Sequence, residues 1–137
     1  MKIEKNEKFV RLNFQKDKVI LKEGTLGDAV YIIIEGKVEI RLGQFGKNPK
    51  TLATRTRGDV IGEMALLDGK SHSASVVAVE DTVVNAMSPD EFHRRIGKLD
   101  PFMRGIMKML VSRLRDATDY FRESKVEVNW IDWKRYD

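Results

Sequence analysis

With 137 residues, of which 42% are hydrophobic and 34% charged, the chain has the length and composition of one ordinary globular domain. It contains no cysteine, which excludes disulfides, thiolate nucleophiles and cysteine-ligated zinc. The net charge of +4 is mixed with acidic residues along the sequence, so it predicts a solvated surface rather than a patch for nucleic acid or membrane. Since the charged N-terminus does not resemble a signal peptide and no apolar stretch approaches the roughly 20 residues that span a bilayer, we expect a cytoplasmic protein.

From about Phe14 to Met87 the chain has the pattern of short strands separated by glycine turns. The run with Val38, Ile40 and Leu42 alternates strictly, as expected for a half-buried strand. Glycine at a turn can take positive φ, so we expect the runs on either side of Glu35-Gly36 to pair as a hairpin. Close, regular spacing of short strands indicates a mainly β roll, sandwich or barrel rather than a βαβ sheet. The strand candidates are residues 18–21, 29–34, 37–42, 52–56, 74–79 and 82–87.

Two helices are predicted to follow the strands. Ser88 and Glu91 have the spacing of a capping box, with Pro89 at the first helical position, so a helix begins there and runs to about Lys98. Asp100 followed by proline repeats the signal and predicts a longer helix. Apolar residues recur on one face of that helix, and we expect them to pack on the roll or on a partner's helix. This stripe comprises Phe102, Ile106, Met109, Leu110, Leu114, Ala117 and Phe121.

The tail after Lys125 is aromatic. Trp130, Trp133 and Tyr136 have the character of interface anchors, so the tail either docks a partner or folds back onto its own domain. Only 12 residues follow Lys125, too few for a helix-turn-helix module. We therefore do not expect this chain to bind DNA directly.

The segment 58–76 carries the most distinctive chemistry. It passes from a strand through one helical turn and back into a strand, and such a turn presents main-chain N–H groups suited to an anion. Gly62 and Ala65 are small enough to let a phosphate approach the main chain. Ser73 can donate a hydrogen bond, and Glu63 can accept one from a sugar hydroxyl. The same residues also fit a tight corner that binds no ligand.

Residues 62–67 (Gly-Glu-Met-Ala-Leu-Leu) and 73–76 (Ser-Ala-Ser-Val) resemble the phosphate-binding cassette of cyclic-nucleotide-binding domains. That family occurs in catabolite-activator-type regulators, in regulatory subunits of cyclic-AMP-dependent kinase and in nucleotide-gated channels. The glycine-punctuated run 19–36 also fits the family's front half, so the resemblance spans roughly Phe14 to Arg115.

The resemblance implies a double-stranded β-helix, or jelly-roll, with a short inserted cassette helix and closing C-terminal helices. This β-roll domain would occupy residues 1–125, and the aromatic tail would occupy residues 126–137. No catalytic residue, metal or cofactor is implied, so we do not expect an enzyme. The expected ligand is a cyclic mononucleotide, cAMP or cGMP.

The resemblance also implies roles for individual residues. Glu63 would bind the ribose 2′-hydroxyl, and the main-chain N–H groups of Ala65 and Leu66, with Ser73, would hold the cyclic phosphate. The base would be covered from the long helix, where Thr118, Arg115 or Tyr120 could reach it, and Arg115 and Thr118 are the candidate lid residues. The expected ligand-binding set is Gly62, Glu63, Met64, Ala65, Leu66, His72, Ser73 and Ala74.

The sequence departs from the family's cassette at His72, where the family has an arginine that pairs with the phosphate. Histidine offers at most two donors and only partial charge near neutral pH. Losing a charged hydrogen bond of about 1.5–3 kcal/mol weakens binding roughly ten- to a hundredfold. His72, helped by Lys70, therefore serves as a weaker, pH-sensitive donor, or the pocket takes a different ligand, or it has lost its ligand.

Other functions are less well supported. A metal-dependent cupin needs a cluster of histidines, but the chain has only His72 and His93, and His93 is most simply a surface or helix-packing residue. A serine hydrolase needs a Gly-x-Ser-x-Gly elbow, which is absent from the sequence. We therefore expect a sensor that acts through its C-terminal helix on a partner chain or in a homodimer. The alternative is a degenerate scaffold that serves protein–protein interaction without nucleotide.

Overall fold

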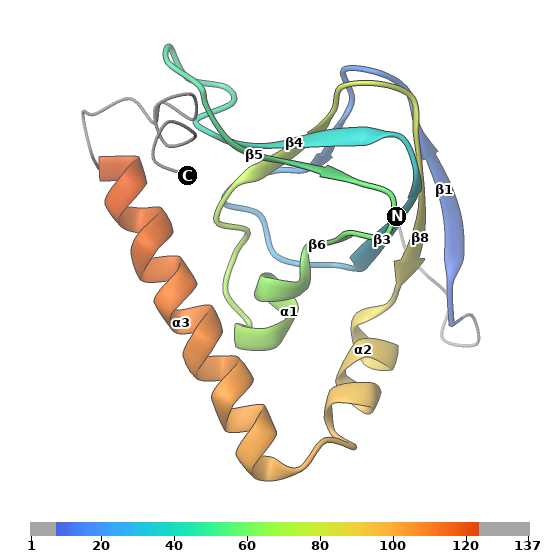
Figure 1. Ribbon diagram of the computed structural model, residues 1–137, viewed down its shortest axis with the longest axis vertical. Coiled ribbons are helices and arrows are strands. Elements are labelled where there is room, and N and C mark those ends of the chain that lie inside the picture. Colours follow the sequence, from blue (N-terminus) through green and yellow to red (C-terminus); the bar gives the residue numbers. More distant parts are fainter. Residues whose placement is uncertain (1–7, 124–137) are drawn as a thin grey trace, which may run out of the picture.

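The computed structural model describes residues 8–123, which form two β-sheets and three helices (Figure 1). The expectations for residues 124–137, including the aromatic tail and the domain boundary at 125, lie outside the described residues. The strands are β1 (Val10–Phe14), β2 (Val19–Leu21), β3 (Val30–Glu35), β4 (Lys37–Leu42), β5 (Lys50–Thr56), β6 (Val60–Ile61), β7 (Ser75–Ala78) and β8 (Thr82–Met87). The helices are α1 (Glu63–Asp68), α2 (Pro89–Ile96) and α3 (Pro101–Glu123).

The expected β-roll is confirmed. The strands form two antiparallel four-stranded sheets with the orders β1-β8-β3-β6 and β2-β7-β4-β5. Buried side chains of both sheets, such as Ile33 and Val84 from one and Val38 from the other, form one hydrophobic core. Among residues 8–123, β4 and β5 are the one pair of consecutive strands that lie side by side, because the chain otherwise crosses between the sheets.

The hairpin expected across Glu35-Gly36 is wrong. β3 pairs with β6 and β8, whereas β4 pairs with β5 and β7, so the two strands belong to different sheets. Gly36 does have the expected positive φ, 104°, but it forms a corner at which the chain passes from one sheet to the other. A Cβ at Gly36 would lie 2.6 Å from the carbonyl oxygen of Asp81 and 2.5 Å from Oγ1 of Thr82. Gly36 therefore packs closely against the segment where the chain passes from β7 to β8, and this packing requires a residue without a side chain.

Strand β1 was not expected from the sequence. It pairs antiparallel with β8, and its residues alternate between half-buried and exposed, with Val10, Leu12 and Phe14 facing inward. This alternation is the signal that identifies the strand in the sequence. Its position at the sheet edge keeps its inward residues only half-buried.

Both predicted helix starts are confirmed. The main-chain N–H of Glu91 donates to Ser88 Oγ at 3.2 Å, and that of Met103 donates to Asp100 Oδ2, also at 3.2 Å. The Glu91 carboxylate binds Arg94 and Arg95, so only one half of the capping box forms. Within residues 8–123, no helix is long and apolar enough to span a bilayer.

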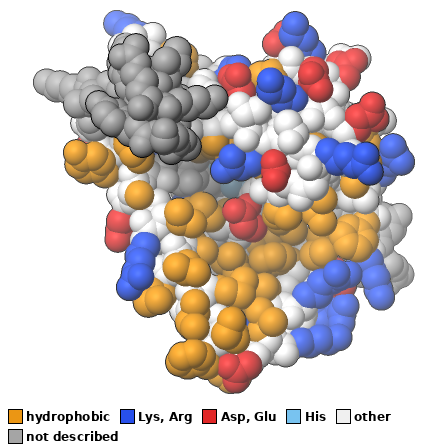
Figure 2. Space-filling view, in the orientation of Figure 1, with side chains coloured by type: hydrophobic (Ala, Val, Ile, Leu, Met, Phe, Trp, Pro, Cys, Tyr) orange, Lys and Arg blue, Asp and Glu red, His pale blue; other side chains and the backbone are white. Residues whose placement is uncertain are grey.

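The apolar stripe of α3 is divided between two surroundings. Leu114, Ala117 and Phe121 line a cavity between α3 and the roll, whereas Phe102 and Leu110 are 74% and 50% exposed. The face of α3 that approaches α1 is instead centred on Val111, which is buried. In Figure 2, hydrophobic side chains gather over the lower half of the visible face, where α3 and α1 lie. The packing of Phe102 and Leu110 on a partner's helix stays a prediction.

Replacing Gly36 by alanine is expected to cost at least about 3 kcal/mol in the free energy of unfolding, since it combines positive φ with overlap against main-chain atoms. Gly24→Ala is the matched control, because Gly24 also has positive φ, 85°, but no atom lies within 4 Å of the added Cβ. It should cost about 1–2 kcal/mol. Urea denaturation of both variants measures the difference, and equal losses would show that packing does not set the corner.

Candidate ligand-binding site

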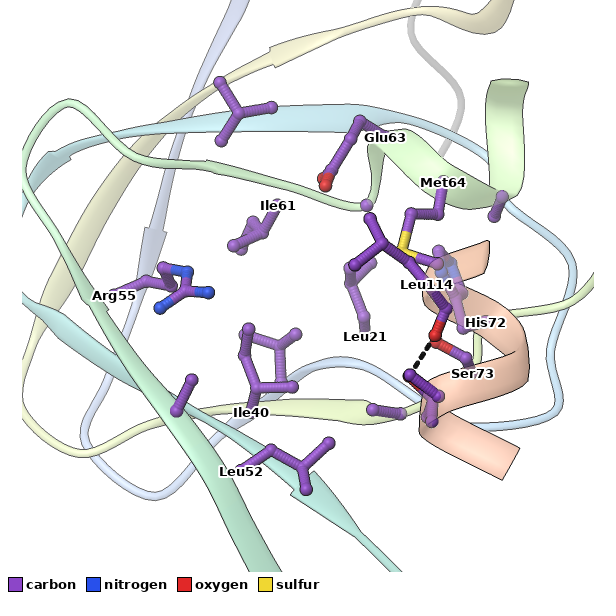
Figure 3. A pocket seen from close by; sticks show the side chains of 18 of the residues that line it. Leu21, Ile40, Leu52, Arg55, Ile61, Glu63, Met64, His72, Ser73 and Leu114 are labelled. Atoms are coloured by element: carbon purple, nitrogen blue, oxygen red, sulfur yellow. Dashed lines mark hydrogen bonds between the residues drawn. The ribbon is translucent and has the colours of Figure 1, made fainter. Parts of the chain in front are cut away.

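A cavity of about 400 Å³ lies between the sheet β2-β7-β4-β5, helix α1 and helix α3 (Figure 3). This volume is within the roughly 300–1,000 Å³ typical of small-molecule sites. Most of the lining is apolar and comes from strands of the roll, including Leu21, Ile40 and Leu52. The polar and charged side chains that line it are Arg55, Glu63, His72, Ser73 and Thr118.

Helix α1 begins at the cavity because of the glycine before it. Gly62 has φ 85° and ψ 0°, a left-handed conformation, and a Cβ there would lie 3.1 Å from both Ala29 O and Leu21 Cδ1. Glycine therefore turns the chain out of β6 and starts the helix beside the cavity wall. The first main-chain N–H groups of any helix lack partners within it, and Glu63, Met64 and Ala65 of this first turn line the cavity. The helical turn expected in this segment is confirmed.

The roll holds the other side of α1 through Gly27. A Cβ at Gly27 would lie 2.9 Å from Cβ of Ala65 and 3.2 Å from Cδ2 of Leu66. The chain therefore needs glycine at this position to let α1 approach the turn before β3. His93 fixes α1 from a third side, with Nε2 lying 2.9 Å from the carbonyl oxygen of Leu66, so its expected role in helix packing is confirmed.

The carboxyl group of Glu63 faces the cavity (Figure 3). Burial raises its pKa above the usual value, and a hydrogen bond from its own main-chain N–H and the charge of Arg55 offset that shift only in part. A carboxyl group held in apolar surroundings is a strong acceptor for a hydroxyl that enters with a ligand.

His72 is buried, with only 7% of its surface exposed. Its main-chain N–H donates to Thr25 O at 2.8 Å, and its carbonyl oxygen accepts from the N–H of Gly24 at 2.9 Å. Burial lowers the pKa of the imidazole, and the nearby positive charge of Arg115 adds to this, while Asp28 acts in the opposite direction. The imidazole is therefore neutral at neutral pH.

The structure brings together most of the residues expected to bind the ligand. Leu66 is the exception, because its side chain is buried in a second core cluster with Val30 and Met87. Of the two candidate lid residues, Thr118 lines the cavity and Arg115 does not. The expected residues that line the cavity are Gly62, Glu63, Met64, Ala65, His72, Ser73 and Ala74.

Arg115 instead ties α3 to residues 68–73, which we call the cassette loop. Its Nη2 donates to Asp68 Oδ1 at 2.8 Å, its Nε also contacts the Asp68 carboxylate, and its Nη1 donates to Ser71 O at 2.9 Å. Burial alone would raise the pKa of Asp68, but hydrogen bonds from Arg115 and from the N–H of Lys70 lower it. Arg122, about two turns further along the same face of α3, donates to the carbonyl oxygen of Ser73. Two arginines therefore attach α3 to the cassette loop.

The sequence analysis did not identify Arg55 or Arg122. Arg122 has no sequence signal, since its partner Ser73 lies 49 residues away. Arg55 does have a sequence signal, which is its place in the alternating pattern of β4 and β5. In that pair, Arg55 lies opposite Val38 and Ala53 lies opposite Ile40. Opposed residues of an antiparallel pair point to the same face, and Val38 points into the core. The alternation of β4 therefore places Arg55 inward once the pairing is known.

Comparison with known proteins gives consistent results. A family profile described as "Cyclic nucleotide-binding domain" matches residues 11–98. The chain is 37% identical over 109 residues to the cyclic AMP receptor protein of Thermus thermophilus, covering 80% of this chain and 50% of the relative. It is 36% identical over 94 residues to the cAMP-dependent protein kinase regulatory subunit of Aspergillus fumigatus, covering 68% of this chain and 22% of the relative. This chain therefore spans at most half the length of these two relatives.

Solved structures show the same similarity. The cAMP-bound form of the EAL enzyme Bd1971 superposes with a TM-score of 0.74 at 33% identity, covering 82% of this chain and 31% of that chain. The catabolite activator protein of Thermus thermophilus superposes with a TM-score of 0.64 at 37% identity, covering 80% of this chain and 51% of that chain.

The buried, neutral state of His72 predicts a loss of stability in acid. Above the pKa of about 6.5 in the unfolded chain, both states hold a neutral ring; as pH falls below it, the unfolded state binds the proton first. The free energy of unfolding should then fall, by at most about 1.4 kcal/mol per pH unit from this group. Urea denaturation at pH 7.5 and 5.0 should show a smaller acid loss in His72→Gln than in the wild type. Equal losses would mean that the ring takes up its proton over the same pH range in the folded and unfolded states.

Proposed function

This chain belongs to the cyclic nucleotide-binding domain family, and from that premise we propose that it binds a cyclic mononucleotide and transmits the bound state through α3. The observation that carries the proposal is the cavity where the start of α1, Glu63 and Ser73 meet. An apolar cavity with a few convergent polar groups suits a nucleotide, which has one apolar base and one charged end. Relatives described as cyclic AMP receptor and cAMP-bound support this class of ligand.

The start of α1 is proposed to hold the cyclic phosphate. Main-chain N–H groups at a helix start carry partial positive charge and point along the helix axis, and those of Ala65 and Leu66 are the proposed donors to the phosphate. Ser73 adds a hydroxyl donor on the same side of the cavity. Glu63, whose carboxyl is half-enclosed, accepts from the ribose 2′-hydroxyl. The burial of Leu66 does not conflict with this role, because only its main chain takes part.

His72 is proposed to act as a conditional phosphate donor. The ring is neutral in the ligand-free protein, and a phosphate anion beside it would raise its pKa by opposite charge. Binding then takes up a proton, so the affinity for an anionic ligand increases as pH falls. This mechanism supplies in acid part of the charge that an arginine supplies at every pH.

Helix α3 is proposed to carry the signal. It contributes Thr118 to the cavity wall, while Arg115 and Arg122 bind the cassette loop. A ligand that contacts both the cassette loop and α3 favours the arrangement in which both are engaged. The exposed apolar residues Phe102, Met109 and Leu110 then offer this arrangement to a partner chain or to a second copy of this one.

The alternative function is a scaffold of the same fold that binds a protein partner without a nucleotide. The observation in its favour is the neutral His72 in the position of the phosphate-binding arginine. The exposed apolar residues of α3 suit a partner under either function. The two functions differ only in whether the cavity is filled, so a binding measurement separates them.

Calorimetric titration with cAMP, cGMP, cCMP and cUMP tests the proposal directly. We expect saturable binding of at least one of them, and a loss of at least tenfold in affinity in Glu63→Ala, since a hydrogen bond to a charged group contributes about 1.5–3 kcal/mol. Glu35→Ala is the control, because Glu35 is exposed at the end of β3 and does not line the cavity. The absence of a binding signal with all four nucleotides would favour the scaffold function.

The role of His72 predicts a pH-dependent affinity. Binding to the wild type should tighten between pH 8.0 and 6.0, because the bound state takes up a proton at His72. His72→Arg should bind roughly ten- to a hundredfold more tightly at pH 8.0 and lose most of this dependence. Both proteins share Glu63, so the difference between their pH profiles reports on position 72 alone. Parallel profiles would contradict a role for the ring in binding phosphate.

A further inference from the structure

A second cavity, of about 340 Å³, lies where the three helices meet, and we call it the helix cavity. Figure 1 shows α1 between α2 and α3, and both of those helices contact it. The first turn of α1 lines the cavity proposed for the nucleotide, whereas Leu66, Leu67 and the C-cap Gly69 line the helix cavity. Among residues 8–123, none lines both cavities. Helix α1 therefore separates two distinct cavities.

One part of the wall of the helix cavity is apolar and belongs to the core of the protein. Leu66 is buried, and Phe92 of α2 packs against it in the second core cluster. Ile96 of α2 and Met107 of α3 add further apolar surface. His93 holds this wall in place, because its Nε2 donates to the carbonyl oxygen of Leu66 at 2.9 Å. The packing of the three helices therefore preforms an apolar surface inside the cavity, as is common in small-molecule sites.

The other part of the wall carries positive charge. Arg104 and Lys108 both line the helix cavity, and no carboxylate of residues 8–123 does. Residues four apart on a helix are neighbours on one face, and like charges at this spacing repel each other. Within the described part of the chain, neither side chain forms an ion pair within 4.0 Å. The cavity therefore holds two cations that these residues do not neutralise.

Arg104 is the deeper of the two cations, since it is half-buried while Lys108 is exposed. Its Nε is enclosed and has no hydrogen-bond partner among residues 8–123. An enclosed donor without an acceptor is unfavourable, and an acceptor that reaches it restores the lost hydrogen bond. A guanidinium has five N–H donors in a planar fork, a shape that matches the oxygens of a carboxylate or a phosphate. The chemistry of Arg104 therefore calls for an oxyanion at this end of the cavity.

The carboxylates of the surrounding helices are not placed to supply that oxyanion. Asp100 accepts a hydrogen bond at the start of α3, and Glu91 binds two arginines of its own helix. Asp68 is held by Arg115. Asp90 lies in the first turn of α2, whereas the residues of α2 that line the cavity begin at Phe92. An acceptor for Arg104 must therefore come from outside residues 8–123.

We propose that the helix cavity is a second ligand site, which binds a small organic anion with a carboxylate or phosphate group joined to an apolar body. The oxyanion would pair with Arg104 and Lys108, and the apolar body would cover Phe92 and Met107. An inorganic anion would leave the apolar wall uncovered, and a neutral molecule would leave Arg104 without its acceptor. A ligand here would contact all three helices and so stabilise their arrangement around α1. The site is separate from the nucleotide cavity and does not rest on the function proposed for it.

Methionine methyl groups allow each cavity to be tested separately. Met107 lines the helix cavity and Met64 lines the nucleotide cavity, so their ¹³C-methyl NMR signals report on different sites; Met107→Leu and Met64→Leu identify the signals. We expect benzoate, phenyl phosphate or both to shift the Met107 signal saturably, with a Kd of about 1 mM or tighter. The stronger of the two probes shows whether the site prefers a carboxylate or a phosphate. Benzyl alcohol and inorganic phosphate should bind at least about tenfold more weakly, since each lacks one half of the recognition.

Substitutions on α3 test the role of the deeper cation. Arg104→Leu should weaken binding of the stronger probe at least about tenfold, and Arg104→Lys should keep only part of the affinity because lysine lacks the planar fork. Arg113→Leu is the matched control, since it removes the same charge from an exposed residue of the same helix that does not line the cavity. Its affinity should stay within about twofold of the wild type, because exposed charges are largely screened by salt. Urea denaturation establishes that each variant is folded, and Arg104→Gln replaces Arg104→Leu if the apolar variant is not.

Four results would overturn the inference. These are no shift of the Met107 signal with any probe, a shift of the Met64 signal alone, equal affinity for benzoate and benzyl alcohol, and equal losses in Arg104→Leu and Arg113→Leu. The second result would place the probe in the nucleotide cavity, and the third would make the helix cavity merely apolar. A titration with the four cyclic nucleotides, followed at Met64, tests the proposed function in the same sample. Its failure would leave the Met107 result standing, so the two proposals fail independently.

Discussion

The site depends on the hydrogen bonds and close contacts that hold residues 62–73 against the roll. The main chain of His72 exchanges two hydrogen bonds with the turn at Gly24 and Thr25, and Gly27 lets α1 approach the roll to within contact distance. Gly62 turns the chain into α1 at the edge of the cavity. These contacts are made by main-chain atoms and by glycines, so no side chain is needed inside the cavity to form them. They also fix the direction of the main-chain N–H groups at the start of α1.

Two ionisable groups of the cavity depart from their behaviour in water for the same reason, which is burial. Burial raises the pKa of Glu63 and lowers that of His72, so both groups favour their neutral forms more than they would in water. Groups with shifted pKa values that are gathered in one apolar cavity are a recurring property of functional sites.

Helix α3 has two distinct faces, as expected for a helix that would contact both the ligand site and another protein surface. One face is tied to the cassette loop by Arg115 and Arg122, and it reaches the cavity at Thr118. The other carries the exposed apolar residues Phe102, Met109 and Leu110. Burial of these side chains against another surface would remove apolar area from water. The same helix therefore contacts the cassette loop on one face and exposes apolar side chains on the other.

The sequence by itself determined what depends on neighbouring residues: the strand alternation of β4, the helix starts at Ser88 and Asp100, and the glycine turns. Its resemblance to a known family added the β-roll and most of the cavity-lining residues. The tertiary structure alone decided which strands pair. Because of that pairing, Gly36 forms a corner between the two sheets and not a hairpin turn, and Arg55 faces the cavity. It also decided that Phe102 and Leu110 of the α3 stripe face outward while Leu114 lines the cavity. Pairing and burial depend on contacts between residues far apart in the chain, which local patterns do not specify.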